Sequence, residues 1–170
     1  MSKESALKGL FTIGYEGADL ADFIATLRQA GVTTLLDVRE LPLSRKKGFS
    51  KRALGEAMLS AGIAYRHERD LGSPKTIRER LHSDGDYEQF FKSFSTYLCQ
   101  QRPLLKELAG SLDGSVALMS FERDPATCHR SVVARQLELL VGLKTKHLGV
   151  THGASHNRAR IGAGEGVPAA

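Results

Sequence analysis

The chain has 170 residues, of which 41% are hydrophobic and 25% are charged, and this composition is typical of one globular domain with a sizeable core. No apolar run approaches the roughly 18 to 20 residues that span a bilayer, so we expect no membrane association. The two cysteines, Cys99 and Cys128, are too few for a disulfide framework, and residues 1–8 lack the apolar core of a secretory signal. We therefore expect a cytoplasmic protein.

The N-terminal part of the chain predicts a strand, a helix and a second strand. Residues 10–13 form an apolar, β-prone run, and residues 33–38 form another. Between these runs, four apolar residues repeat at helical spacing: Leu20, Phe23, Ile24 and Leu27. Asp19 is placed to cap this helix and Gly31 to end it. The three elements make a right-handed βαβ unit with parallel strands.

The rest of the chain continues the alternation of helices and strands. In order, we predict a helix starting at Ser50 and reaching residue 62, a weaker strand at 63–66, an aromatic-rich helix at 87–98, a short helix at 103–108, a strand at 115–121, a helix through 133–141 and a last strand at 145–148. The fold class is α/β: a single three-layer domain over residues 1–148, with a mostly parallel sheet and helices on both faces. Residues 149–170 show no period, and we expect a flexible basic tail there.

The strand ends carry the residues with chemical potential. In an open parallel sheet, ligands bind outside the carboxyl ends of the strands. The first strand leads to Tyr15, the second to Asp37, Arg39, Ser44 and Arg45, and the strand at 115–121 to Glu122, Cys128, His129 and Arg130. Three polar clusters therefore converge on one rim of one sheet, and we expect a single site there.

The segment from Glu122 to Arg130 predicts an anion site at a helix start. Either Asp124 followed by Pro125, or Thr127, is placed to cap the helix, so Cys128 and its two neighbours lie near its first turn. Free N–H groups and the helix dipole favour an anion there, and the same field would depress the pKa of Cys128. The alternative is a buried, inert cysteine beside an arginine that pairs with Glu122 or Asp37.

Asp37 raises a second question, because a carboxylate at the end of an apolar strand is costly unless it is paired. Arg39, Arg45 or Arg130 is the expected partner, and that pairing could be its whole role. Equally, Asp37 or Glu122 could act as a general acid or base near a developing anion. Tyr15 could donate a hydrogen bond to a substrate oxygen or could simply cap the core.

A basic window at residues 39–52 holds six basic residues and one acidic residue. The net charge of this window is +5, which equals the net charge of the whole chain. Such a patch attracts phosphates on small molecules or on nucleic acid, although a solvated surface has the same appearance. The chain has no CxxC, HExxH, GxGxxG or Walker motif, so we expect no metal, dinucleotide or other cofactor.

The order of these motifs resembles that of the domain-of-unknown-function 488 (DUF488) family of small bacterial and archaeal α/β proteins. The similarity rests on Thr12-Ile13-Gly14-Tyr15, Leu36-Asp37-Val38-Arg39, Pro42, Ser44-Arg45, Phe49, Ile63-Ala64-Tyr65, Leu71-Gly72, Glu122 and Cys128-His129-Arg130. The resemblance implies the fold and the residues that matter, but no particular reaction. Family members often carry a cysteine two residues before the matching glutamate, where this chain has Ser120. If the family uses two thiols jointly, Cys128 would stand alone here.

Two functional hypotheses follow from these patterns. The first is an enzyme, a hydrolase or transferase, that acts on a phosphate-containing or other anionic substrate of the nucleotide or nucleic-acid class. Its anion-binding residues would be Tyr15, Arg39, Ser44, Arg45 and Arg130, and its catalytic residues Asp37, Glu122, Cys128 and His129. The alternative is a non-catalytic nucleic-acid binding module that uses the loop at 39–52. A rhodanese-like sulfurtransferase and a purely structural salt-bridge network are further alternatives, and the oligomeric state stays open.

Overall fold

A computed structural model describes residues 6–156 of the chain. The described residues contain a five-stranded sheet in the order β3-β2-β4-β1-β5, and every pair of neighbouring strands is parallel. The strands are β1 (Leu7–Gly14), β2 (Thr34–Asp37), β3 (Ala64–His67), β4 (Gly114–Ser120) and β5 (Thr145–Leu148). The predicted α/β class with a parallel sheet is confirmed.

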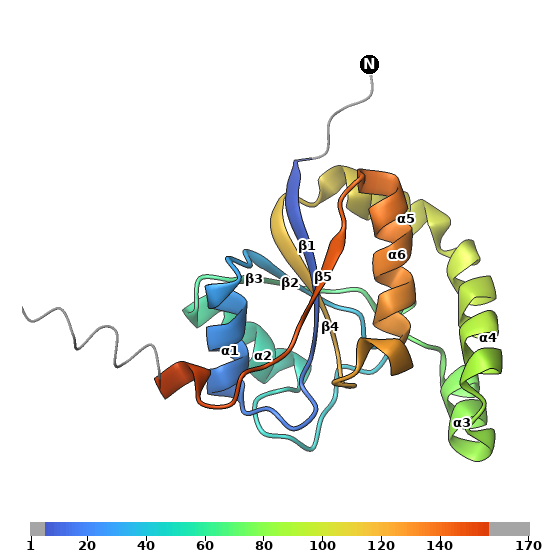
Figure 1. The fold of residues 1–170 in the computed structure, drawn as a ribbon, viewed down its shortest axis with the longest axis horizontal. Helices are drawn as coiled ribbons and strands as arrows, with labels where there is room; N and C mark the ends of the chain where they lie inside the picture. Colours follow the sequence, from blue (N-terminus) through green and yellow to red (C-terminus); the bar gives the residue numbers. More distant parts are fainter. Residues whose placement is uncertain (1–5, 157–170) are drawn as a thin grey trace, which may run out of the picture.

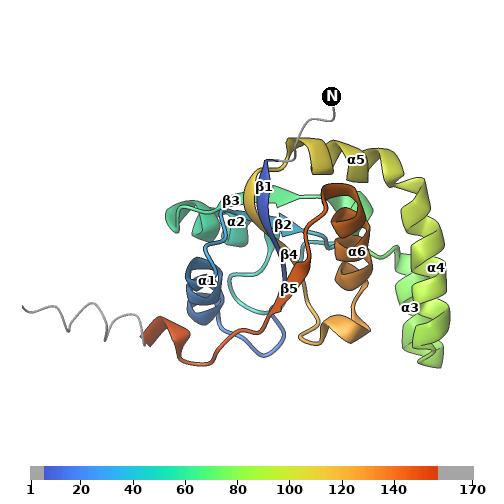
Figure 2. The same ribbon diagram turned by 45° about the horizontal axis from the view of Figure 1, so that its top comes forward.

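Helices cover both faces of the sheet, so the domain has three layers (Figure 1). One face packs against α1 (Leu20–Gln29) and α2 (Lys51–Ser60), with Phe23, Phe49 and Met58 at the centre of the buried cluster. The opposite face packs against α4 (Tyr87–Gln100), α5 (Arg102–Ser111) and α6 (His129–Val141). Figure 2 shows α3 (Lys75–Asp84) beside α4 at the outer edge of this second layer.

The crossover connections open a crevice above β2 and β4. The chain leaves β2 toward α2 on one face and leaves β4 toward α6 on the other. Neighbouring parallel strands whose connections diverge in this way leave a gap outside their carboxyl ends, where α/β proteins bind ligands. The strand order therefore sets the place of the candidate site before any side chain is considered.

Local capping agrees with the sequence at α1 and differs from it at α6. Asp19 caps α1 by accepting a hydrogen bond from the backbone N–H of Asp22 at 2.8 Å. Asp124 instead caps a short 3₁₀ turn (Pro125–Thr127), and Cys128 is the N-cap residue of α6. Of the two predicted caps of α6, Asp124 therefore lies about one turn too early and Thr127 one residue too early. The extra turn places His129 and Arg130 at the first two positions of the helix.

Helix α3 has no counterpart among the predicted elements, because it buries no residue and so carries no apolar stripe. It is held next to the site by Gly72, which directly follows a 3₁₀ turn (Arg69–Leu71). A Cβ atom at Gly72 would lie 2.1 Å from the backbone nitrogen of Glu40. Only glycine permits this close approach of two backbones, which brings Ser73 and α3 to the end of β2.

The first residues of the predicted tail contact the domain. Asp22 of α1 is buried and accepts hydrogen bonds from the backbone N–H groups of Gly153 and Ser155, at 2.8 and 3.0 Å, and from the Ser155 hydroxyl at 2.7 Å. Ala154 between them is also buried. This anchor could not be predicted from the sequence, since the acceptor lies more than 130 positions away from the donors. The remainder of the predicted tail, residues 157–170, lies outside the described residues.

Among the described helices, none combines the length and the apolar character that a bilayer span requires.

Candidate functional site

A cavity of about 560 Å³ lies at the carboxyl ends of β2 and β4, with α3 and α4 as its outer wall. Three of the sequence-predicted site residues line it: Arg39, Glu122 and His129. The other lining residues were not predicted: Glu40, Leu41, Ser73, Arg78, Leu81, His82, Gly85, Tyr87, Phe90, Ser120, Phe121 and Thr127. The walls thus combine charged groups near the strand ends with aromatic side chains from α4 and from the end of β4.

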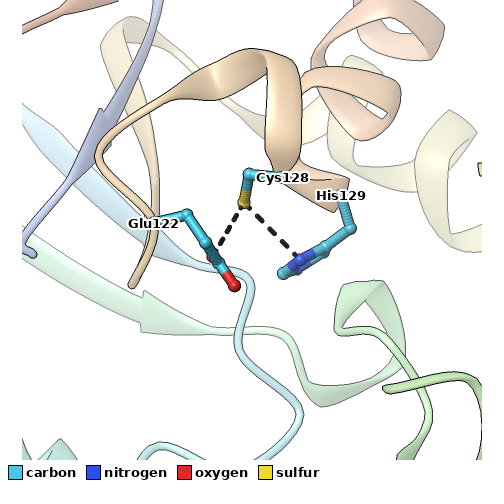
Figure 3. Close-up of side chains that lie close together, drawn as sticks. All are labelled: Glu122, Cys128 and His129. Carbon is cyan, nitrogen blue, oxygen red and sulfur yellow. Dashed lines mark hydrogen bonds between the residues drawn. The ribbon is translucent and has the colours of Figure 1, made fainter. Parts of the chain in front are cut away.

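Glu122, Cys128 and His129 form one cluster beside this cavity (Figure 3). The Cys128 thiol donates a hydrogen bond to Glu122 Oε2 at 3.1 Å, and its sulfur lies 3.7 Å from His129 Nδ1. The end of β4 supplies the glutamate, and the first residues of α6 supply the other two. Glu122 is partly exposed, whereas Cys128 and His129 are buried. Glu122 and His129 line the cavity, and Cys128 does not.

The orientation of the imidazole is set by a backbone contact. His129 Nε2 lies 2.7 Å from the carbonyl oxygen of Val38, which can only accept, so Nε2 carries the hydrogen. Burial lowers the pKa of His129, which favours the neutral ring. The Nδ1 atom is then an acceptor whose lone pair faces the sulfur of Cys128. Phe94 of α4 packs edge-on against the ring and fixes its plane further.

Cys128 does not have the activated thiolate that its position at a helix start predicted. Burial, and after it the neighbouring Glu122 carboxylate, raise the pKa of its thiol to about 12. The nearby Arg130, the backbone N–H of that residue at 3.5 Å and the Ser120 hydroxyl at 2.7 Å favour the thiolate but are outweighed. Desolvation of the sulfur therefore exceeds the effect of the helix terminus, and the thiol is protonated at neutral pH.

Arg130 is buried, and its guanidinium points into the protein rather than into the cavity. It donates to the backbone carbonyls of Glu122 and Arg123 and, at 3.1 Å, to the Ser120 hydroxyl. Gly14 makes room for this turn, because a Cβ there would lie 1.9 Å from the Glu122 carbonyl oxygen. Arg130 thus holds the β4–α6 connection through backbone groups, and not through the carboxylate of Glu122 or Asp37.

At the end of β2, Asp37 and Arg39 form a closed buried network. The two side chains make a bidentate pair at 2.9 and 2.7 Å, and Tyr65 donates to the same carboxylate at 2.5 Å. Arg39 also donates to the Tyr15 hydroxyl at 3.2 Å and to the Phe49 carbonyl at 2.7 Å. Asp37 is fully buried, so it has no free face for a substrate. This geometry matches the structural reading of Asp37 and Tyr15 that the sequence left open.

Ser44 and Arg45 lie in the loop between β2 and α2, away from the lining of the cavity. The Ser44 hydroxyl accepts from the backbone N–H of Lys46 at 3.0 Å, and its carbonyl accepts from the Ser50 hydroxyl at 3.2 Å. These contacts shape the loop. Arg45 itself is exposed.

Ser73 and Arg78 are the polar lining residues that sequence reasoning missed. Arg78 donates to the Ser73 carbonyl, and its other terminal nitrogen lies 3.5 Å from Glu40 Oε1. The Ser73 hydroxyl is buried and has no hydrogen-bond partner among the described residues. The only signal in the sequence was the Leu71-Gly72 pair, which marks a close backbone approach but does not reveal which side chains follow it into the cavity.

The ligand atoms of Glu122, Cys128 and His129 all lie within 4.8 Å of one another. A thiol sulfur, an imidazole nitrogen and a carboxylate oxygen at this spacing can hold a metal ion. The sequence predicted no metal because these ligands do not form a motif of fixed spacing on one element. The glutamate follows β4, and the other two residues lie at the start of α6.

No curated protein and no solved structure matches the chain. The family model for the domain of unknown function DUF488 matches residues 19–137, which is more than half of the chain and includes every residue of the Glu122–Cys128–His129 cluster. The motifs on which the resemblance rested thus coincide with the network at β2 and the cluster at β4. The chain belongs to the DUF488 family.

Proposed function

We propose that this protein is an enzyme that acts on a small anionic substrate carrying a planar ring, of the size of a nucleotide. The observation that supports the proposal most directly is the cavity of about 560 Å³ with Glu122 and His129 on one side and Arg78 and Ser73 on another. Ligand pockets in proteins hold roughly 300 to 1,000 Å³, so a substrate of this size fits.

The anionic part of the substrate would bind at α3. Arg78 keeps about a third of its side chain exposed and contacts Glu40 only at 3.5 Å, so it has N–H groups to offer. The unpartnered Ser73 hydroxyl is a second donor beside it. Arg39, by contrast, is neutralised by Asp37 and uses its guanidinium on protein groups. Aromatic side chains of Tyr87 and Phe90 would contact the planar ring.

The chemistry would fall to Glu122, supported by His129. Glu122 lines the cavity and is within reach of a substrate proton, which is the first requirement for a general base. Cys128 is unsuited to attack a substrate in the metal-free form, because its sulfur is buried and protonated. Arg130 serves as a positioning residue that fixes the backbone of Glu122.

The proposal is tested by thermal unfolding with a ligand panel: phosphate, sulfate, mononucleotides, sugar phosphates and short RNA and DNA. A ligand at a hundredfold excess over its Kd stabilises the native state by about 2.7 kcal/mol, which is a readily visible shift. Arg78→Ala should abolish the shift. Arg80→Ala is the matched control, because it lies on the same helix outside this cavity.

A shift for one ligand class that disappears in Arg78→Ala and persists in Arg80→Ala supports the assignment and names the substrate class. Turnover of that ligand, lost in Glu122→Gln, would establish the enzyme. A panel that gives no shift, or a shift equal in both arginine variants, contradicts the proposed pocket.

A second candidate is nucleic-acid binding by the loop at 39–52, because Arg45, Lys47, Lys51 and Arg52 are exposed. Phe49 is fully buried, so the loop offers charge without a stacking ring. This mode predicts that the affinity for short RNA or DNA falls steeply with salt, with a slope set by the phosphates neutralised. Reversing Arg45 and Lys47 to glutamate should abolish it. Binding that is insensitive to ionic strength would contradict this second candidate.

A further inference from the structure

We propose that Glu122, Cys128 and His129 bind a divalent transition-metal ion, such as zinc, at the edge of the cavity. The inference rests on the proposed function, since it gives that same site its reactive centre, but it is tested by metal binding rather than by turnover. In residues 6–156, no other group of three or more histidine, cysteine, aspartate or glutamate side chains brings its ligand atoms together in this way.

The cluster contains more hydrogen-bond acceptors than hydrogens, which suits the binding of a cation. The Cys128 thiol has one hydrogen, and two acceptors face its sulfur: Glu122 Oε2 at 3.1 Å and His129 Nδ1 at 3.7 Å. The imidazole cannot supply a second hydrogen from Nδ1, because its Nε2–H is directed at the Val38 carbonyl. The single thiol hydrogen can therefore serve only one of these two acceptors at a time. A metal ion satisfies the sulfur, the nitrogen and the oxygen at the same time.

The distances between the ligand atoms suit a tetrahedral ion. Two ligands at about 2.3 Å (sulfur) and 2.1 Å (nitrogen or oxygen) from zinc lie roughly 3.6 Å apart at the tetrahedral angle. The observed separation from Cys128 Sγ to His129 Nδ1 is 3.7 Å, and that to Glu122 Oε2 is 3.1 Å. The cysteine and histidine are thus already at ligand spacing, and a small rotation of the partly exposed Glu122 side chain completes the set.

The kinds of donor select among metals. A thiolate and an imidazole favour zinc and its neighbours in the first transition row, whereas magnesium and calcium prefer sets made of oxygen. The thiolate and the carboxylate together would carry two negative charges, which neutralise a divalent ion in this buried place. That balance matters because the guanidinium of Arg130 lies behind Ser120 and would repel an uncompensated cation.

The surrounding contacts are those that orient metal ligands. His129 donates its other ring N–H to a backbone carbonyl, which fixes the tautomer that leaves Nδ1 free to coordinate. The Cys128 sulfur accepts from the backbone N–H of Arg130 at 3.5 Å and lies 2.7 Å from the Ser120 hydroxyl. Both contacts would stabilise a thiolate once the metal has displaced its proton.

Three protein ligands leave one tetrahedral position for water or substrate, the arrangement of a catalytic rather than a structural zinc site. Glu122 and His129 both line the cavity, so this position opens toward the proposed substrate. In the zinc-bound form Glu122 would serve as a ligand and not as the general base, and a zinc-bound water, which loses its proton near pH 7, would supply the nucleophile.

The test uses the full chain, freed of metal by chelation and dialysis. Zinc binding is measured by calorimetry, and Co²⁺ is added separately as a spectroscopic probe, because tetrahedral Co²⁺ bound to a thiolate gives intense visible and near-ultraviolet bands. We expect one zinc per chain. Cys128→Ser should lose the thiolate-to-cobalt band and weaken zinc binding by at least about tenfold, since even changes behind the ligands cost 10- to 100-fold.

Two matched controls separate this site from adventitious binding. Cys99→Ser removes an exposed cysteine, and His147→Gln removes an exposed histidine whose Nδ1 lies 2.6 Å from the Thr12 hydroxyl. Both should bind zinc and cobalt as the wild type does. Glu122→Gln is the second test variant, in case Cys128→Ser fails to fold. The Glu122 side chain is more exposed than that of Cys128 and is not needed for packing.

Equal zinc affinity in the wild type, Cys128→Ser and Glu122→Gln overturns the inference, as does a cobalt spectrum without a thiolate band. Zinc bound through Cys128 in a protein that recognises no pocket ligand would support the metal site and contradict the proposed function. If the protein takes up no zinc but still binds a pocket ligand, the proposed function is supported and the metal site is contradicted.

Discussion

Two clusters at the carboxyl ends of adjacent strands, one after β2 and one after β4, contain similar residues in opposite states. At β2, the Asp37 carboxylate accepts from Arg39 through both oxygens, from the Arg39 backbone and from Tyr65. At β4, the arginine binds backbone carbonyls instead, and the carboxylate of Glu122 faces a thiol and the cavity.

The difference separates a scaffold from a site. A buried carboxylate with all its acceptor positions satisfied is stable and chemically inert. A carboxylate, a sulfur and an imidazole nitrogen with too few hydrogens among them retain the capacity to bind a ligand. The predictions below test this division, beginning with the largest expected effect.

Removing the carboxylate of the closed network should cost most. In Asp37→Ala the Arg39 guanidinium stays buried without its partner, so we expect the free energy of unfolding to fall by about 3–5 kcal/mol. Urea denaturation measures this loss. Arg52→Ala, which breaks an exposed pair with Glu56, is the control and should change the stability by under about 0.5 kcal/mol. Equal effects of the two changes would break the comparison.

Tyr65→Phe should cost less, about 1.5–3 kcal/mol, because it removes one hydrogen bond to a charged acceptor. Burial and the Asp37 carboxylate raise the pKa of Tyr65, so its contribution is complete below the unfolded pKa of about 10 and is lost as the pH rises toward the folded value. The stability difference between wild type and Tyr65→Phe should therefore shrink above pH 10. A difference that stays constant to higher pH would contradict this role.

Glu122→Gln should leave the fold nearly intact, with a loss of about 1 kcal/mol from one weakened hydrogen bond to the thiol. The same change should abolish turnover of any pocket substrate. Urea denaturation and the activity assay together decide the point. A loss of stability as large as that of Asp37→Ala would place Glu122 in the scaffold.

The smallest global effect is expected at Asp22, a buried carboxylate that belongs to neither cluster. Backbone N–H groups of Ser155 and Gly153 and the Ser155 hydroxyl lower its pKa to about 2. The anchor is therefore complete above the unfolded pKa of about 4 and is lost as the pH falls through 2. Asp22→Asn should accelerate amide exchange in residues 151–156 at neutral pH and leave the core unchanged. Unaltered exchange there would show that the apolar contact of Ala154 holds the segment alone.

Much of the fold could be predicted from periodicity, because the helices and strands that pack against the sheet carry regular apolar patterns. Helix α3 escaped this reasoning since it buries nothing. The rim of the sheet was also predictable, because parallel strands place their carboxyl ends together. The roles of single residues at this rim were not predictable. The roles of Arg39 and Arg130 depend on which carbonyls and carboxylates tertiary packing brings to them.

The thiol of Cys128 shows the limit most clearly. A helix start lowers a cysteine pKa and burial raises it, and the sequence reveals only the first influence. The adjacent His129 shows how such burial arises, because Phe94 of α4 and the Val38 carbonyl contact it from distant parts of the chain.

The place of β1 in the sheet also governs the order of events during synthesis. Its neighbours are β4 and β5, so Leu10 pairs with Val116 on one side and with Thr145 on the other. When the ribosome has released the first half of the chain, β2 and β3 can already pair, but β1 has no partner. An apolar strand thus lacks its partners until the C-terminal third emerges, and long-range pairing of this kind slows folding in general.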